Sequence, residues 1–114
     1  MSLEKKYHRD TLVIKIAGQF DMVTAEEFRR LVDPELDRRQ IRNLVINLGG
    51  VSFIDSSGLG VIIGRYKKLS QSGGKLWIAA ARPPVRKILE LSGLQKIIQF
   101  YESEKQALEA VREA

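Results

Sequence analysis

Segments typical of β-strands alternate along this chain with segments typical of α-helices, and this alternation restricts the fold more than any other feature. Four apolar runs indicate strands, the first alternating as in a half-buried strand and the second apolar throughout: 11–18 (TLVIKIAG), 43–48 (NLVINL), 75–80 (KLWIAA) and 96–100 (KIIQF). Strands separated by helices pair in parallel, because a parallel connection needs a long crossover. A shorter strand near residues 3–7 would add an antiparallel start. We therefore predict an α/β fold, with a small, mixed, largely parallel sheet of four to five strands packed with about four helices.

The first helical segment opens at a capping box formed by Thr24 and Glu27, and its apolar residues recur at helical spacing as far as Leu36. Pro34 interrupts this helix, because an interior proline removes a backbone donor and collides with the preceding turn. Alternatively, Asp33 caps a second short helix with Pro34 at its first position. Both arrangements predict a kink or a break at this point.

Three more helical segments follow. The first of them begins within FIDSSGLG (53–60) and ends near 70–74. Its apolar residues form a stripe along one side: Leu59, Ile62, Ile63, Tyr66 and Leu69. The basic residues Arg65, Lys67 and Lys68 are expected to face away from that stripe. The next covers 82–93, has prolines in its first turn and ends at Gly93. Ser103 and Gln106 form a capping box that opens the last helix.

The size and composition of the chain suit one compact domain, residues 1–114, because 44% of its 114 residues are hydrophobic. Cysteine is absent, so nothing indicates a disulfide scaffold, a thiolate metal site or a cysteine nucleophile. The polar N-terminus lacks the apolar stretch of a signal peptide, and no segment approaches the ~20 apolar residues that span a bilayer. We expect a cytoplasmic protein with no membrane partner.

The chain is basic, with 19 Lys and Arg against 14 Asp and Glu and a net charge of +5. Clustered cations would favour a polyanionic partner through counterion release. Here the basic residues are scattered and mostly alternate with acids, and no aromatic residues lie between them as in surfaces that stack bases. We interpret the charge as a solvated surface and predict no direct nucleic-acid partner, with a DNA or RNA role as an alternative.

Two loops are expected to meet at one edge of the sheet. The segments 18–25 (GQFDMVTA) and 53–60 each follow a predicted strand and lead into a helix. Loops that leave the carboxyl ends of parallel strands gather at the same edge and commonly hold the functional site. These two segments are therefore the candidate site.

The second loop contains more polar oxygens than a helix start requires. Asp55 or Ser56 can cap the helix by accepting a hydrogen bond from a backbone N–H two or three residues on. One cap needs one oxygen, whereas three candidates stand in a row, followed by Gly58 and Gly60, which lower helix propensity by ~1 kcal/mol each relative to Ala. Such glycines indicate a close approach to the backbone. For Gly60 and Gly64, tight packing of the helix on the sheet is an equal explanation.

Several kinds of catalytic site lack their required residues. A hydrolase nucleophile elbow needs glycines two residues before and after its serine, which neither Ser56 nor Ser57 has. The sole histidine, His8, lies among charged residues, so a triad has no evident base. No Gly-Lys-Ser/Thr triplet forms a P-loop, and no His, Asp and Glu cluster has metal-ligand spacing. The sequence gives no sign of an enzyme, a cofactor or a metal site.

A serine hydroxyl can also be a substrate. A phosphoryl group on Ser57 would add about −1.5 to −2 charges at a helix start, where N–H groups and the helix dipole favour an anion. That would stabilise the domain by at most ~2 kcal/mol. In an interface shaped for a neutral hydroxyl, the same dianion meets desolvation and like-charge costs on the order of several kcal/mol. Phosphorylation would thus switch association while the fold stays intact.

The segment 51–69 (VSFIDSSGLGVIIGRYKKL) closely resembles the signature of the anti-sigma factor antagonists, the bacterial branch of the STAS domain family, and especially its stage II sporulation member. The likeness extends to 18–28 (GQFDMVTAEEF), 73–80 (GGKLWIAA) and 88–98 (ILELSGLQKII), and so covers nearly the whole chain. The resemblance implies a single STAS domain.

The resemblance also implies a mechanism. In this family the unmodified protein binds an anti-sigma factor, itself a serine kinase with bound nucleotide, and so frees the sigma factor for transcription. The kinase phosphorylates the second serine of the motif, here Ser57, the modified protein is released, and a PP2C-type phosphatase restores the hydroxyl. By position, the acidic neighbours of that serine and the loop and helix start offered to the kinase are Asp21, Asp55, Ser56, Gly58 and Leu59.

The sequence departs from the sporulation pattern beside the first loop. Many sporulation members have Glu before the strand-exit acid and a His pair after it, where this chain has Gln19, Met22 and Val23. These positions bear on partner specificity and lie outside the loop of residues 53–60 that carries Ser57. The alternatives are a general stress-response antagonist with the same switch and a STAS-like module that binds a small ligand.

Overall fold

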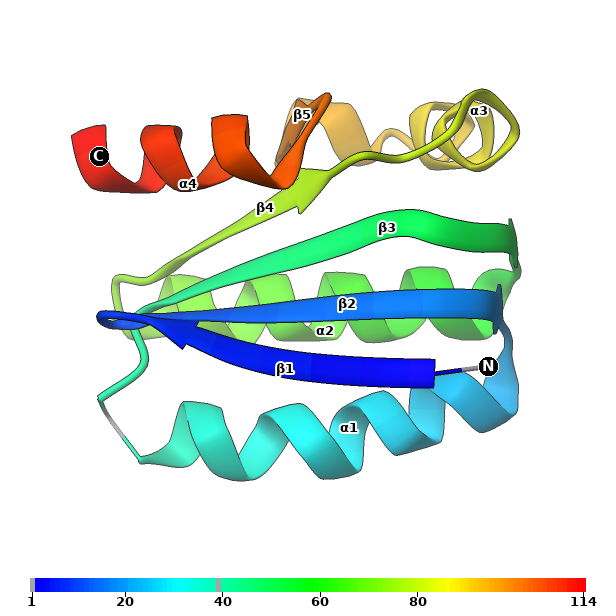
Figure 1. Cartoon of the computed structure of the whole chain (residues 1–114). Helices are drawn as coiled ribbons and strands as arrows, with labels where there is room; N and C mark the ends of the chain where they lie inside the picture. The colour runs from blue at the N-terminus through cyan, green and yellow to red at the C-terminus, as the bar shows by residue number, and fades with distance from the viewer. Residues whose placement is uncertain (1, 39) are drawn as a thin grey trace.

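The structure, a computed structural model, describes residues 2–38 and 40–114 (Figure 1). Its elements in chain order are β1 (Ser2–His8), β2 (Thr11–Phe20), α1 (Met22–Asp37), β3 (Asn43–Ile54), α2 (Ser56–Gln71), β4 (Lys75–Ala79), α3 (Pro83–Leu91), the 3₁₀ helix η1 (Leu94–Lys96), β5 (Gln99–Tyr101) and α4 (Glu104–Glu113). Within these residues the strands form one sheet in the order β1-β2-β3-β4-β5. β1 is antiparallel to β2, and the other neighbours are parallel. The predicted mixed, largely parallel sheet is confirmed.

Helices cover both faces of the sheet. One face packs against α1, α2 and α3 in the main core, where Ile14 is 0% exposed. The opposite face packs against α4 in a smaller cluster that includes Val13, Trp77 and Ala107. Because β2 is covered on both faces, the expectation of a half-buried strand there is wrong. Of its first six residues only Lys15 is exposed.

The start of α1 differs from the predicted capping box. Its N-cap is Asp21, whose side chain accepts a hydrogen bond from the Thr24 N–H with an N···O distance of 3.1 Å. Thr24 is buried, and its hydroxyl donates to the Gln19 carbonyl at 2.7 Å. The predicted pair of Thr24 with Glu27 is therefore wrong, because the aspartate caps the helix and the threonine ties it to β2.

α1 continues through Pro34 to Asp37 as one helix. The predicted break, and the alternative of a second helix capped by Asp33, are wrong. Pro34 and Arg30, whose carbonyl loses its helical partner, both lie on the exposed face of the helix. Water can bind that carbonyl, while the buried Val32 holds the helix on the core.

Strand ends also differ from the predictions. β2 continues beyond residue 18 to Phe20, and β3 continues beyond residue 48 to Ile54, with shifts of register between them. Residues 96–98 do not belong to β5, which begins at Gln99, because η1 ends at Lys96. The two longer strands bring the candidate loops directly to the sheet edge.

The remaining helices follow the sequence patterns with one exception. Arg65 does not face away, since its side chain is 15% exposed and its Nη1 lies 3.1 Å from Oδ1 of Asp33 on α1. α3 opens with Pro83, and Ser103 caps α4 by accepting a hydrogen bond from the Gln106 N–H at 3.1 Å. None of the helices in the described ranges is long and apolar enough to cross a membrane.

Glu104, the first residue of α4, attaches this helix to two strands. Its carboxylate accepts a hydrogen bond from Nδ2 of Asn47 in β3 at 3.1 Å and pairs with Lys6 of β1. Burial alone would raise the pKa of Glu104, but Lys6 and Asn47 donate to the charged form and Lys15 adds a further cation, so the pKa is lowered. The ionised carboxylate thus helps to hold α4 on the sheet.

A Glu104→Gln variant tests this attachment through its pH dependence. A carboxyl with a lowered folded-state pKa contributes stability that is present above its unfolded pKa and is lost as pH falls through the folded pKa. We expect the wild-type free energy of unfolding to fall more steeply than that of Glu104→Gln below about pH 4.5, in urea titrations. Glu109→Gln, exposed on the same helix, is the control and should keep the wild-type slope. Equal slopes for all three proteins would contradict the attachment.

Candidate functional site

β2 and β3 end side by side, with Phe20 paired to Ile54, at the right of Figure 1. The next residue in each case is an aspartate that caps a helix, Asp21 for α1 and Asp55 for α2. The backbone conformations are nearly the same, with φ −104° and ψ −166° at Asp21 and φ −109° and ψ −171° at Asp55. Because paired strands lie ~5 Å apart, the two aspartates form one acidic neighbourhood, and the two predicted loops meet.

Asp55 is the residue that caps α2. Its Oδ1 accepts hydrogen bonds from the backbone N–H groups of Ser57 at 2.8 Å and Gly58 at 3.2 Å. Ser56 is therefore the first residue of the helix and not its cap, which decides between the two alternatives left open by the sequence. The Asp55 N–H donates to the Phe20 carbonyl at 3.3 Å, so the start of α2 is joined to the end of β2.

The two serines occupy the first two positions of α2. Ser56 is exposed, whereas Ser57 is half-buried. Asp55 accepts from the Ser57 backbone N–H, but within the described part of the chain no hydrogen bond engages the Ser57 hydroxyl. The site therefore holds an uncommitted hydroxyl at the start of a capped helix, next to a carboxylate.

Gly58 is the glycine that the packing requires. A Cβ atom there would lie 2.6 Å from the Phe20 carbonyl oxygen and 2.8 Å from Cγ1 of Ile54. At Gly60 and Gly64, by contrast, a Cβ would meet nothing within 4 Å. Tight packing on the sheet, the alternative considered for Gly60 and Gly64, is therefore wrong for both, because the close approach occurs at Gly58.

Large apolar side chains surround the two acidic caps. Met22 is 71% exposed, Val23 59% and Phe53 47%. Phe53 was not among the predicted site residues. Because it stands next to the buried Ile54 in β3, strand alternation places it on the opposite, exposed face, and that alternation could have indicated it. Leu59, in contrast, packs partly against the main core and supports the start of α2.

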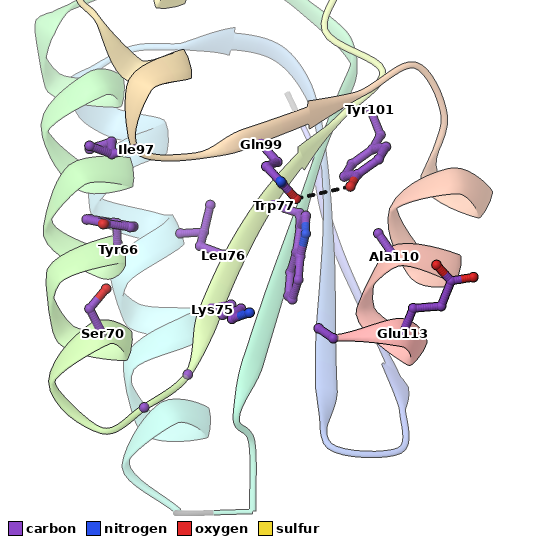
Figure 2. Close-up of a pocket in the computed structure, with 13 residues that line it drawn as sticks. Tyr66, Ser70, Lys75, Leu76, Trp77, Ile97, Gln99, Tyr101, Ala110 and Glu113 are labelled. Carbon is purple, nitrogen blue, oxygen red and sulfur yellow. Dashed lines mark hydrogen bonds between the residues drawn. The ribbon is translucent and has the colours of Figure 1, made fainter.

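The candidate site is an exposed surface at the edge of the sheet. Residues 53–60 line none of five cavities, of about 270 to 670 Å³, formed by the described residues. The cavity of about 670 Å³ lies at β4, with Tyr66 and Trp77 on opposite sides of the strand (Figure 2). No group of three or more His, Cys, Asp or Glu within 2–38 and 40–114 could hold a metal ion. An exposed hydroxyl edge flanked by apolar side chains suits contact with another protein.

Residues 2–107 match the model of the STAS domain, so the chain belongs to the STAS domain family. It is 40% identical over 108 residues to the anti-sigma F factor antagonist of Paenibacillus polymyxa, covering 95% of this chain and 92% of that protein. It is 26% identical over 102 residues to the anti-sigma-B factor antagonist of Staphylococcus epidermidis, covering 90% and 94%. The resemblance to this family inferred from residues 51–69 is confirmed.

Solved structures share the fold over the whole chain. The anti-sigma factor antagonist SpoIIAA in its unphosphorylated form matches with a TM-score of 0.88 and 27% identity, covering 99% of this chain and 98% of that one. The Bacillus cell fate determinant SpoIIAA in the phosphorylated form matches with a TM-score of 0.80 and 26% identity, covering 96% and 99%. The predicted single STAS fold is therefore confirmed.

Two alanine variants test the packing of the loop. Gly58→Ala should lower the free energy of unfolding by about 1–3 kcal/mol, since the new methyl group collides with the Phe20 carbonyl. Gly60→Ala, two residues away in open space, should leave stability unchanged or raise it by up to about 1 kcal/mol. Urea unfolding of both variants gives the comparison. If both variants lost similar amounts of unfolding free energy, the close contact with Phe20 would not explain why glycine is needed at position 58.

Proposed function

We propose that this chain is an anti-sigma factor antagonist whose unphosphorylated form binds an anti-sigma factor and so releases a sigma factor. The anti-sigma factor is a serine kinase with bound nucleotide, phosphorylation of Ser57 ends the binding, and a PP2C-type phosphatase reverses it. The observation that carries the proposal is the uncommitted Ser57 hydroxyl at the exposed start of α2, beside the Asp55 cap. The similarity to named antagonists, and to one solved in both phosphorylation states, supports it.

The charges around Ser57 favour a switch that acts on the partner. The N–H groups of Ser57 and Gly58 would favour a phosphate, but Asp55 already accepts from both. A phosphate on Ser57 would add about −1.5 to −2 charges beside Asp55 and near Asp21. The stabilisation of the domain expected from the helix dipole is thus opposed by like charges. The larger effect is repulsion and desolvation in a complex.

The bare side of α2 provides the contact surface. Ser56, Gly60 and Gly64 are spaced four residues apart and share one side of the helix. No atom lies within 4 Å of a Cβ built at Gly60 or Gly64, so a partner's backbone can approach closely there. The exposed Met22 and Val23 at the start of the neighbouring α1 add apolar contact area. In this proposal Leu59 positions the helix start.

The pathway and the setting follow the same similarities. Identity of 40% to an antagonist of an anti-sigma F factor, against 26% to one of an anti-sigma-B factor, favours the sporulation pathway over the general stress response. We propose a cytoplasmic regulatory protein with no enzymatic activity and no cofactor of its own. Its partners are proteins, with neither a membrane nor a direct nucleic-acid contact.

Phosphorylation by a cognate anti-sigma kinase is the first test. After incubation with the kinase and ATP, intact mass should show one added phosphate on the wild type and on Ser56→Ala, and none on Ser57→Ala. Ser56→Ala is the matched control, because it removes the neighbouring hydroxyl on the same turn. Fragment mapping places the phosphate. If no form is modified by a kinase that is active on another antagonist, the proposed switch is wrong.

Binding of charge variants tests the electrostatic account. Ser57→Asp should bind the kinase at least about tenfold more weakly than the wild type, and Ser57→Ala should bind as the wild type does, in calorimetric titrations with nucleotide present. Ser70→Asp places the same charge on an exposed position at the far end of α2 and is the control. Wild-type affinity in Ser57→Asp would rule out exclusion by charge.

A further inference from the structure

β1 is the outermost strand of the sheet, at its lower edge in Figure 1. It pairs with β2 in an unbroken antiparallel register, from Ser2 opposite Ala17 to His8 opposite Thr11. All of its 7 residues are exposed or half-buried. Many sheet edges are protected by a proline, a bulge or a very short strand, and β1 has none of these. Its outer side is therefore a template on which another strand can pair.

The hairpin turn determines which backbone groups of β1 face outward. His8 and Thr11 flank a two-residue turn, so these two residues exchange both of their N–H···O bonds. Along an antiparallel strand, such pairs alternate with pairs that do not bond to each other. The N–H and C=O groups of Leu3, Lys5 and Tyr7 consequently face away from β2. Within residues 2–38 and 40–114, no other backbone group bonds to them.

Side chains on both faces of the sheet hold β1 in place. On one face, Leu3 packs against the main core, and the Tyr7 hydroxyl donates to the carboxylate of the buried Glu35 in α1. On the other face, Lys6 pairs with Glu104 of α4. An ordered edge loses less conformational entropy on binding than a loose segment does. The outward groups of β1 are thus arranged for pairing before a partner arrives.

A second copy of β1 is complementary to the first. In an antiparallel pair, residues whose backbone groups face outward must lie opposite residues of the same kind. A two-fold axis at Lys5 satisfies this rule and uses the whole strand. The pairs across the axis are then Ser2 with His8, Leu3 with Tyr7, Glu4 with Lys6, and Lys5 with itself. Symmetry repeats the apolar–aromatic pair and the pair of opposite charges, and both kinds stabilise neighbouring strands.

We propose that β1 pairs edge to edge with β1 of a second copy of this chain, which joins the two sheets into one. The contact is closed by its two-fold axis, so each copy uses the same surface. The opposite edge of the sheet is β5, with only 3 residues, and offers a much shorter template for further strands. The pairing therefore gives a dimer and not a filament.

The dimer is expected to be weak. A single pair of strands buries a narrow strip compared with the interface of a stable dimer. The two copies of Lys5 meet at the axis, and like charges directly opposite each other oppose the pairing. This lysine also lies over the Tyr7 ring, with Nζ 5.9 Å from the ring centroid, which draws its charge away from the axis. Association therefore depends on concentration and responds to the charge at position 5.

The proposed interface leaves the candidate site accessible. The two-fold axis makes the strands of the two copies run in opposite directions, so the two loops that carry Ser57 lie at opposite ends of the joined sheet. Each loop remains free to contact another protein. The inference depends on neither the kinase nor phosphorylation, so its failure would leave the proposed switch untouched.

Sedimentation velocity over a concentration series up to about 1 mM tests the pairing. We expect the wild type to pass from monomer to dimer. Lys5→Pro removes an outward N–H that the monomer does not use, so this variant should stay folded and monomeric. Lys5→Thr keeps the N–H and removes the like charges, so it should dimerise at least as tightly as the wild type. A wild type that stays monomeric throughout would overturn the proposal, as would a folded Lys5→Pro protein that dimerises equally well.

A mixed dimer tests the position of the axis without relying on proline. Unlabelled Lys5→Glu, titrated into the isotope-labelled wild type, places opposite charges at the axis and should bind at least about threefold more tightly than the wild type binds itself. The NMR shifts should centre on residues 2–8. Lys87→Glu makes the same charge change on an exposed position of α3 and should bind as the wild type does. Equal affinities for the two variants, or shifts centred on another surface, would contradict the pairing.

Discussion

The contact between Gly58 and the end of β2 determines how the candidate site is assembled. Because Gly58 has no side chain, the first turn of α2 lies directly on the Phe20 carbonyl, with a hypothetical Cβ only 2.6 Å from its oxygen. The same carbonyl accepts the Asp55 N–H, so the turn after β3 is held against the strand beside it. Asp55 and Asp21 then start their helices from equivalent positions. A side chain at this glycine would move the helix start, the cap and the serine together.

The starts of α1 and α2 lie side by side, and their capping aspartates affect how a negative charge at this edge would be accommodated. In an isolated helix, the first N–H groups would bind a phosphate. Here Asp55 and Asp21 already accept hydrogen bonds from those groups. In the proposed switch, a phosphate on Ser57 would find the N–H groups of Ser57 and Gly58 already bonded to Asp55. In the proposed switch, the effect of the added charge therefore falls mainly on association with the partner.

Strand and helix order could be predicted from the sequence because apolar periodicity is a local property that each segment carries alone. Element ends were less predictable, since β2 and β3 extend past Gly18 and Leu48 through pairing with each other. At the site, the pattern of acids and serines identified the loop. It could not distinguish Gly58 from Gly60, because only packing shows which glycine touches another strand. Arg65 was misplaced for a similar reason, as its partner lies on another helix.

The opposite ends of the sheet differ in charge because the fold gives them opposite helix termini. Parallel strands connected by helices place helix N-termini at the carboxyl ends of the strands, where Asp21 and Asp55 complement them. The helix C-termini consequently lie toward the amino ends, where their partial negative charge favours cations such as Arg112 in the last turn of α4. Arg9, Arg42 and Lys75 lie at this same end of the sheet and add to its positive charge.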